Sequence, residues 1–406
     1  MSVRTFLLTI SMALVVAAGA SAAEGSQMIS VGLRYGSSAV SSALVEGCGE
    51  WRGSHQRRSF DGELRISGGR GEIVASIGDR RGAVGQWIEL TPTGEDQWLE
   101  LDGSAYRGVL RMELERDGRL RITNTLPLEE YVRGVVPNEM FADDEAYKVQ
   151  AVISRTVAAY VRDREKKHRS DGFDICATGH CQVYRGMDSE RPASDAAVAA
   201  TRGEVLTYDG KVIFSAYHSN AGGRTEVVDG AWPGSIREHF LYLAVVESPH
   251  DIVAADLLGY EWCYQWQRTV TADEIERRLA ERGSYVGDVQ DLRVREVTEG
   301  GRVKELDVIG ARRRVRVRGP SEVTALLETP SARLSVKRNG HGFDISGKGH
   351  GHGVGLSQHG ALGMARAGYT YEEILGHYYR GVAVTEDYGA GRARQLEAPK
   401  LQVAAR

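Results

Sequence analysis

The feature that most constrains the fold is a change of hydrophobic periodicity along the chain. Before residue 105, short apolar runs alternate with glycine-rich turns, as in GELRISGGRGEIVASIGDRRGAVGQWIEL (62–90). This pattern is typical of strands joined by tight turns. The segment EAYKVQAVISRTVAAYVRDREKK (145–167) instead spaces Val149, Ile153, Val157 and Val161 four residues apart, which predicts a long helix. Asp143 and Asp144 precede it, where capping residues belong.

Other local signals extend this mixture of strands and helices. Asp117-Gly118 and Asp209-Gly210 lie between alternating runs and predict two hairpins, while Thr271 and Thr370 each begin a capping-box pattern that predicts a helix. Strands and helices come in clusters without regular βαβ alternation, so we expect the α+β class. We expect a small β-rich domain at 24–104, a larger grooved domain of mixed antiparallel strands and helices at 105–387, and a loose tail at 388–406.

The first residues carry an export signal. Residues 1–23 combine Arg4, an apolar stretch and the small residues Ala20-Ser21-Ala22, as in a secretory signal peptide. No later stretch approaches the roughly 20 apolar residues of a membrane helix, so we expect a soluble protein that is secreted or periplasmic. With a net charge of −4 and well-mixed acids and bases, nothing indicates a nucleic-acid surface.

The segment GVVPNEMF (134–141) places one carboxyl group, Glu139, among apolar residues. Such surroundings raise a carboxyl pKa, as a proton donor at neutral pH requires, whereas a helix N-terminus would favour ionisation. Composition alone favours a simpler role, a glutamate that accepts backbone N–H bonds at a helix start. We expect Glu129 and Glu130, a polar pair, to be kept ionised by water.

Two further segments contain candidate binding groups. In ISGKGHGHGVGLSQHGALGMARAG (345–368), alternate glycines allow a ligand to approach the backbone, and the histidines with Ser357 and Gln358 suit a polar ligand better than a metal. The alternative is a structural glycine-rich turn. In KKHRSDGFDICATGHCQVYRG (166–186), four residues match tetrahedral zinc, although the spacing leaves a disulfide between the two cysteines equally open; these residues are His168, Cys176, His180 and Cys181.

Together these segments resemble the SpoIID/LytB family. The resemblance covers roughly residues 106 to 385 and is carried by NTLPLEEYVRGVVPNEM, KVQAVISRTVAAY, CQVYRG, YHSNAGGRTE, GKGHGHGVGLSQHGALGMA and YTYEEILGHYY. It implies a lytic transglycosylase that cleaves the MurNAc–GlcNAc bond of peptidoglycan glycan strands, preferably denuded ones, with Glu139 as the catalytic residue. Some members bind zinc in the segment after the long helix, which favours zinc over the disulfide here. Sporulation itself is not implied.

The implied reaction agrees with a single carboxylate. An ordinary glycosidase needs two. A lytic transglycosylase manages with one, because the C6 hydroxyl of the substrate attacks the anomeric carbon and forms a 1,6-anhydro product. Glu139 would donate one proton and accept another. Candidate sugar-binding residues are Arg155, His218, Ser219, His352, Ser357 and Gln358.

Two other functions stay open at this stage. The LytB side of the family suggests a non-catalytic binding module that modifies a cell-wall amidase. The His/Cys cluster also allows a zinc hydrolase that cleaves amide bonds, but four protein ligands would leave no position for a water molecule.

Overall fold

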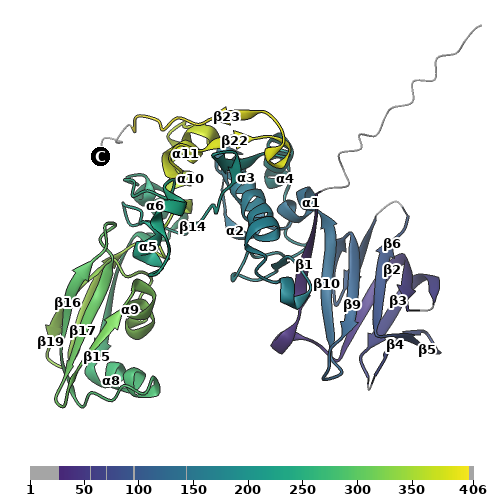
Figure 1. Ribbon diagram of the computed structural model, residues 1–406, viewed down its shortest axis with the longest axis horizontal. Helices are drawn as coiled ribbons and strands as arrows, with labels where there is room; N and C mark the ends of the chain where they lie inside the picture. Colours follow the sequence, from purple (N-terminus) through teal and green to yellow (C-terminus); the bar gives the residue numbers. More distant parts are fainter. Residues whose placement is uncertain (1–26, 55, 70, 95–96, 143, 402–406) are drawn as a thin grey trace, which may run out of the picture.

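The computed structural model describes residues 27–401 except 55, 70, 95–96 and 143. The expected signal peptide (1–23) and the expected cap Asp143 lie outside the described residues. In the part that is described, no helix is both long and apolar enough to span a bilayer. Figure 1 shows an arch, with a large N-terminal sheet on one side, a helical body at the crown and a smaller α/β arm on the other side. The α+β class is confirmed.

The N-terminal arm is an eleven-stranded sheet with the order β11-β1-β10-β9-β6-β2-β3-β4-β5, joined by β7 and β8 at β2. The predicted hairpin at Asp117-Gly118 connects β9 to β10. Because β9 also pairs with β6, the domain boundary expected between residues 104 and 105 falls inside one continuous sheet. The strands are β1 (Met28–Arg34), β2 (Ser42–Gly53), β3 (Arg57–Ser67), β4 (Ile73–Ile77), β5 (Arg80–Gly85), β6 (Trp87–Pro92), β7 (Trp98–Leu101), β8 (Ser104–Arg107), β9 (Val109–Leu114), β10 (Leu120–Pro127) and β11 (Ile175–Cys176).

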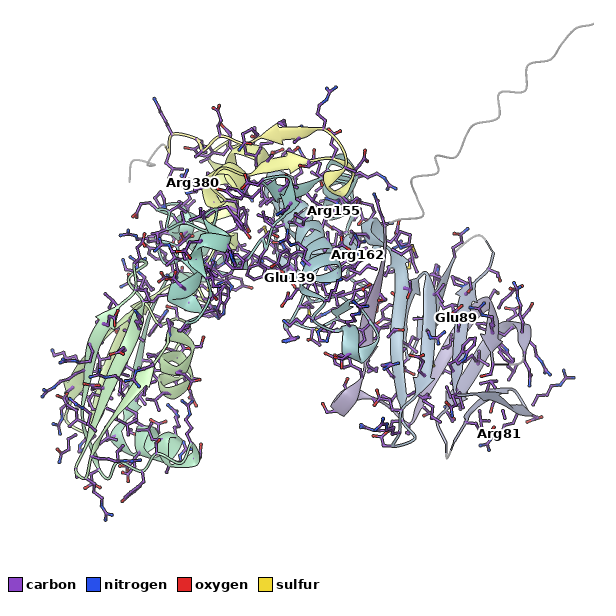
Figure 2. The ribbon with its side chains drawn as sticks, viewed as in Figure 1. Arg81, Glu89, Glu139, Arg155, Arg162 and Arg380 are labelled. Carbon is purple, nitrogen blue, oxygen red and sulfur yellow. The ribbon has the colours of Figure 1, made fainter. Side chains whose placement is uncertain are left out.

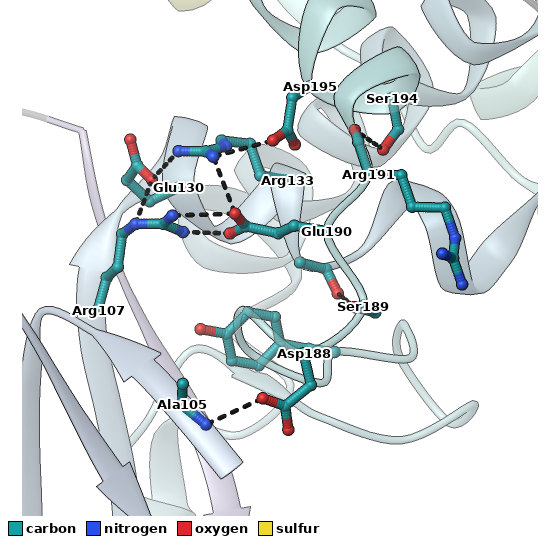
Figure 3. Close-up of polar contacts among 12 residues, drawn as sticks. Ala105, Arg107, Glu130, Arg133, Asp188, Ser189, Glu190, Arg191, Ser194 and Asp195 are labelled. Atoms are coloured by element: carbon teal, nitrogen blue, oxygen red, sulfur yellow. Dashed lines mark hydrogen bonds and ion pairs between the residues drawn. The ribbon is translucent and has the colours of Figure 1, made fainter.

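An ion-pair network joins this sheet to the helical body (Figure 3). Arg107 of β8 pairs with Glu190 and, at 3.3 Å, with Glu130 of the first helix. Arg133 donates to Glu130 at 2.9 Å, to Glu190 at 2.8 Å and to Asp195 at 2.9 Å. Partly exposed pairs contribute little singly, but a network with shared partners fixes geometry. The sheet and the body therefore form one structural unit.

The helical body is built around α3, and the long helix predicted at 145–167 is confirmed. α3 continues into a π-helical turn, η3, and ends where Lys166 adopts a left-handed conformation with φ 53°. Its helices are α1 (Leu128–Arg133), α2 (Val136–Glu139), α3 (Asp144–Tyr160), η3 (Val161–Glu165), η4 (Arg169–Asp171), α4 (Pro192–Ala200), α5 (Val228–Ala231), η5 (Arg237–Phe240), α6 (Asp251–Leu258), α7 (Glu261–Tyr264), α10 (Gln358–Arg366) and α11 (Tyr371–Tyr378); a further short turn, η2 (Gly36–Ser38), follows β1.

The predicted stripe on α3 lies in the core. Val149 and Ile153 pack in the cluster formed with α10 and α11, and Val157 and Val161 pack toward the N-terminal sheet. The hairpin expected at Asp209-Gly210 joins β12 to β13, and the capping box at Thr370 begins α11. The strands of the body are β12 (Val205–Tyr208), β13 (Lys211–Val212), β14 (Tyr217–His218), β21 (Leu356–Ser357), β22 (Ala383–Thr385) and β23 (Ala393–Gln395).

The expectation of a loose tail from residue 388 is wrong for its first part. After η6 (Asp387–Gly389), β23 pairs antiparallel with β22 at the edge of the β13-β12-β22-β23 sheet. Leu396 is buried, and the Tyr388 hydroxyl donates to the Glu129 carboxylate at 2.5 Å. Sequence periodicity missed this segment because a three-residue strand is too short to show one.

The second arm has its own hydrophobic core, which separates it from the body within the expected 105–387 domain. The helices α8 and α9 pack on one side of the sheets β15-β20-β19 and β16-β17-β18 (Figure 1), and the capping box at Thr271 begins α8 as predicted. β20 runs directly into the glycine-rich loop. The elements are β15 (Gln265–Thr271), α8 (Ala272–Glu281), β16 (Val289–Val297), β17 (Val303–Gly310), β18 (Arg314–Arg318), α9 (Pro320–Leu327), β19 (Leu334–Asn339) and β20 (Gly342–Lys348).

Candidate active site

Glu139 is the last residue of the short helix α2 and faces a cavity of about 630 Å³. It lies on the inner side of the arch, below α3 (Figure 2). Glu165 also lines this cavity, but it is exposed at the rim, whereas Glu139 is half-buried. The cavity therefore contains one carboxyl group that is substantially shielded from water.

The surroundings of Glu139 shift the pKa of its carboxyl group. Burial raises the pKa of the Glu139 carboxyl, while hydrogen bonds from the Val183 amide and the Tyr217 hydroxyl offset part of that increase. The Val183 N–H donates to Oε1 at 2.5 Å. Glu139 is therefore not the helix-start residue expected from sequence: it ends α2, and its backbone donor lies 44 residues away. Because Glu139 ends α2, the positive end of that helix does not favour its ionisation.

Gln358 fixes the backbone at Glu139. Its side-chain amide donates to the Glu139 carbonyl at 2.6 Å and to Gln150 of α3 at 3.3 Å. Gln358 begins α10, so this bond ties the glycine-rich loop to α2. The Gln358 side chain therefore lines the cavity and also holds the backbone that positions the Glu139 carboxyl group.

Ser357 is buried and performs a structural task. Its hydroxyl donates to Asp251 at 2.6 Å and accepts bonds from the Ala221 and Gly360 amides, the latter as the N-cap of α10. Burial raises the pKa of Asp251 to about 6. With these partners, Ser357 has no hydroxyl directed to a sugar, contrary to the sequence expectation.

His218 and His352 line the cavity as neutral imidazoles. Nδ1 of His352 accepts from the Val354 amide at 3.0 Å, so its proton is on Nε2, which donates to the Tyr217 carbonyl at 3.0 Å. Nδ1 of His218 donates to the Val354 carbonyl at 3.2 Å, and its buried Nε2 has no partner among the described residues. Burial lowers the pKa of His352 to about 4 and that of His218 well below its ordinary value.

Arg155 lies outside this cavity, and its expected role in sugar binding is not supported. It is completely buried and forms a bidentate ion pair with Glu129, with both N–O distances 2.8 Å. Burial opposes ionisation of Glu129, but the charge and hydrogen bonds of Arg155 outweigh it and hold the Glu129 pKa below its ordinary value. The expectation that water keeps Glu129 ionised is therefore wrong.

Sequence reasoning missed the aromatic wall of the cavity. Phe214 and Trp232 line it together with Tyr217, and the Trp232 ring lies 4.8 Å from that of His352. The Tyr217 hydroxyl is hydrogen-bonded to the Glu139 carboxyl group. No spacing marks Phe214 or Trp232. Their only signal is that they flank the YHSNAGG segment.

A second cavity of about 260 Å³ shares Glu139 and Gln358 with the first. Ser219, a predicted sugar-binding residue, lies here and not in the first cavity. The remaining lining is mostly apolar or aromatic and consists of Met140, Phe141, Leu258, Tyr260, Trp262, Cys263, His350, His359 and Leu362. The carboxyl-bearing residue thus lies where two cavities meet.

The expected metal ligands come together beside the first cavity. One ligand atom from each of His168, Cys176, His180 and Cys181 lies within 4.8 Å of the others, and the two cysteines are free thiols. Cys181 Sγ is 3.4 Å from His168 Nε2, and Cys176 Sγ is 3.5 Å from His180 Nδ1. Zinc bonds of roughly 2.0–2.3 Å in a tetrahedron require such separations. Asp171 contacts the other nitrogen of His168 at 2.8 Å, as carboxylates do behind zinc-binding histidines.

The second arm supports the glycine-rich loop from behind. Arg302, buried with Glu226 at 3.7 Å, occupies the space that a side chain at Gly353 would need. Arg333 donates to the Gly222 carbonyl at 2.5 Å, and the Glu226 amide donates to the Gly353 carbonyl at 2.8 Å. Gly353 has φ +84°, which other residues rarely adopt. The loop that carries His352 is therefore fixed by both the body and the arm.

Comparisons with known proteins agree with this architecture. A family model described as stage II sporulation protein matches residues 116–208, and a model for a domain of unknown function matches residues 256–355, which include the second arm. Stage II sporulation protein D of Bacillus amyloliquefaciens is 33% identical over 276 residues, 64% of this chain and 75% of the relative. The chain belongs to the stage II sporulation protein D family.

Two other relatives extend the comparison. An uncharacterised protein of Brachyspira hyodysenteriae is 30% identical over 333 residues, 80% of this chain and 86% of its own length. A protein of Bacillus subtilis named amidase enhancer is 28% identical over 294 residues, 63% of this chain and 40% of its own length.

Proposed function

We propose that this protein acts at the cell wall as a lytic transglycosylase, which cleaves the MurNAc–GlcNAc bond of denuded glycan strands. The observation that carries the proposal is Glu139, a half-buried carboxyl group with a raised pKa at the junction of two cavities. Family membership supports the choice of glycan as substrate. An exported or periplasmic location, as the N-terminal sequence predicts, is part of the proposal.

The reaction needs one proton donor that later becomes a base. Glu139 donates its proton to the bridging oxygen as the bond from that oxygen to the MurNAc anomeric carbon breaks. The MurNAc C6 hydroxyl then attacks the same carbon and releases its proton to the Glu139 carboxylate. The products are a 1,6-anhydroMurNAc end and a free GlcNAc hydroxyl, and no water is consumed.

The neighbours of Glu139 suit both stages. Burial favours the protonated carboxyl group, and the Val183 N–H bond stabilises the carboxylate that forms after proton transfer. Gln358 holds the backbone in place. Phe214 and Trp232 provide faces for a sugar ring.

We further propose that the four-residue cluster holds a structural zinc ion. Two thiolates and two imidazoles complete a tetrahedral sphere and leave no position for a reacting water. Because His180 and Cys181 immediately precede the segment with Val183, a bound ion would fix the amide that contacts Glu139. This closed ligand set argues against the alternative of a zinc amide hydrolase.

The test compares Glu139→Gln with a control in the same cavity, Glu165→Gln. Each protein is incubated with denuded glycan strands, and the released ends are identified by mass spectrometry. We expect anhydroMurNAc ends from the wild type and from Glu165→Gln, and none from Glu139→Gln. Loss of activity in both variants, with ordinary reducing ends from the wild type, would instead indicate a two-carboxylate hydrolase.

The relative named amidase enhancer supports a second candidate function, a non-catalytic modifier of a cell-wall amidase. In that case neither the wild type nor Glu139→Gln would shorten glycan strands. Both would alter the rate of a purified amidase on intact cell walls to the same extent.

A further inference from the structure

We propose that the 260 Å³ cavity, which shares Glu139 and Gln358 with the larger one, is a subsite for the GlcNAc residue of the scissile bond, with MurNAc in the 630 Å³ cavity. This inference rests on the proposed function and assigns the two sugars to the two cavities. We define the GlcNAc subsite as the smaller cavity with its rim aromatics, Phe141, Tyr260 and Trp262.

Exposed aromatic side chains gather at the rim of this subsite. Among the described residues, the strongly exposed aromatic side chains are Phe141 at 73%, Tyr260 at 49%, Trp262 at 51% and Tyr285 at 48%. All but Tyr285 line this one cavity. An exposed cluster of large apolar side chains marks a binding surface, and aromatic faces pack well on the apolar faces of sugar rings.

The floor of the subsite supplies polar groups without charge. Nδ1 of His359 accepts from the Asn220 side chain at 3.0 Å, which leaves the proton on Nε2. His350 contacts the Cys263 thiol at 3.6 Å, and Ser219 adds a hydroxyl. In a largely apolar pocket, a small number of polar groups is enough to orient a small neutral ligand.

The two sugars differ in charge, and so do the linings of the two cavities. Apart from Glu139, the described residues that line the GlcNAc subsite include no Asp, Glu, Lys or Arg, and burial lowers the pKa of its two histidines, His350 and His359. MurNAc carries a lactyl carboxylate, which such a pocket would leave unpaired, whereas GlcNAc is neutral. The larger cavity has Lys167 at its exposed rim, where a carboxylate can be met.

Position supports the same assignment. The proton donor must face the oxygen that joins the two sugars, so the sugars must extend from Glu139 in opposite directions. Glu139 and Gln358 line both cavities, so a sugar in each cavity would lie next to the proposed proton donor. A stem peptide is a poorer occupant, because its carboxylates would find no cation in this lining.

The test measures glycan binding in the Glu139→Gln background, in which the strand is not cleaved. Two denuded fragments are titrated by calorimetry, one ending in MurNAc and one extended beyond it by a single GlcNAc. We expect the extra GlcNAc to tighten binding by at least about tenfold, as a buried aromatic contact commonly does. Trp262→Ala should remove that gain and Trp262→Phe should keep most of it. Tyr285→Ala, an exposed aromatic outside the cavity, should not change it.

Two results would overturn the inference: an equal gain from GlcNAc in the Trp262→Ala protein, or no gain in the parent. Failure of the proposed function gives a different pattern. If wild type forms no anhydro ends while the Trp262-dependent gain persists, the subsite stands as part of a glycan-binding groove and the reaction is wrong.

Discussion

The Val183 amide donates a hydrogen bond to the Glu139 carboxylate across 2.5 Å and thereby connects the Cys/His segment to the proposed proton donor. Cys181 is two residues before Val183, so a change in the position of the cluster is expected to shift this amide.

Metal removal tests the link between the cluster and Glu139. We expect the purified protein to contain about one zinc per chain, held by the four ligands. Removal of the metal by a chelator should lower glycan cleavage, and zinc should restore it. Cys176→Ser should lose the metal, whereas Cys48→Ser, at an exposed cysteine of the N-terminal sheet, should keep it. Full metal content in Cys176→Ser would contradict this ligand set.

The rate of cleavage should fall as the pH rises through the Glu139 pKa, because only the protonated carboxyl group can donate. That pKa is raised by burial, so activity should persist above the ordinary range of a glutamate. A pH profile of kcat/KM on denuded strands measures this. A rate that increases with pH across the same range would show that Glu139 acts first as a base.

Stability should depend on pH through the same group. A pKa raised in the folded state means that the fold favours the protonated form. Its contribution is complete below the unfolded pKa of about 4.3 and is lost as the pH rises through the folded value. Glu139→Gln should therefore melt at a higher temperature than the wild type at pH 8, and the two should melt nearly together at pH 4. An equal difference in melting temperature between the two proteins at both pH values would contradict this explanation.

Arg155 should matter for stability and not for substrate binding. Replacement by methionine leaves Glu129 buried without its partner, so we expect a loss of about 3–5 kcal/mol in unfolding free energy. The double variant Arg155→Met, Glu129→Gln should recover part of that loss. Denaturant unfolding and the KM of the folded protein test this, and a large rise in KM with unchanged stability would return Arg155 to the sugar-binding set.

Ser357 and its neighbour Gln358 should separate structural from positioning roles. Ser357→Ala removes a helix cap and a buried hydrogen bond and should cost about 1–2 kcal/mol of stability. Gln358→Ala releases the Glu139 backbone and should lower kcat by about tenfold to a hundredfold, as small misplacements of catalytic groups do. Equal effects of both variants on kcat would contradict this division.

Local patterns allowed several elements to be predicted from sequence. The Asp-Gly hairpins, both capping boxes and α3 depend on contacts within a few residues, and all are present. The family motifs pointed to Glu139, Gln358 and the four-residue cluster. Contacts between residues distant in sequence could not be predicted. The sequence therefore suggests sugar binding for Arg155, whereas the structure pairs it with Glu129, 26 residues away. Trp232 and Trp262 carry no spacing signal and emerge only when the fold places them around cavities.

The central claim is that Glu139 transfers protons while the sugar itself supplies the nucleophile. The most direct measurement is the mass of the ends released from denuded strands in water labelled with heavy oxygen. We predict anhydroMurNAc ends without label from the wild type and no new ends from Glu139→Gln. Reducing ends that carry the label, or unchanged anhydro product from Glu139→Gln, would contradict the claim.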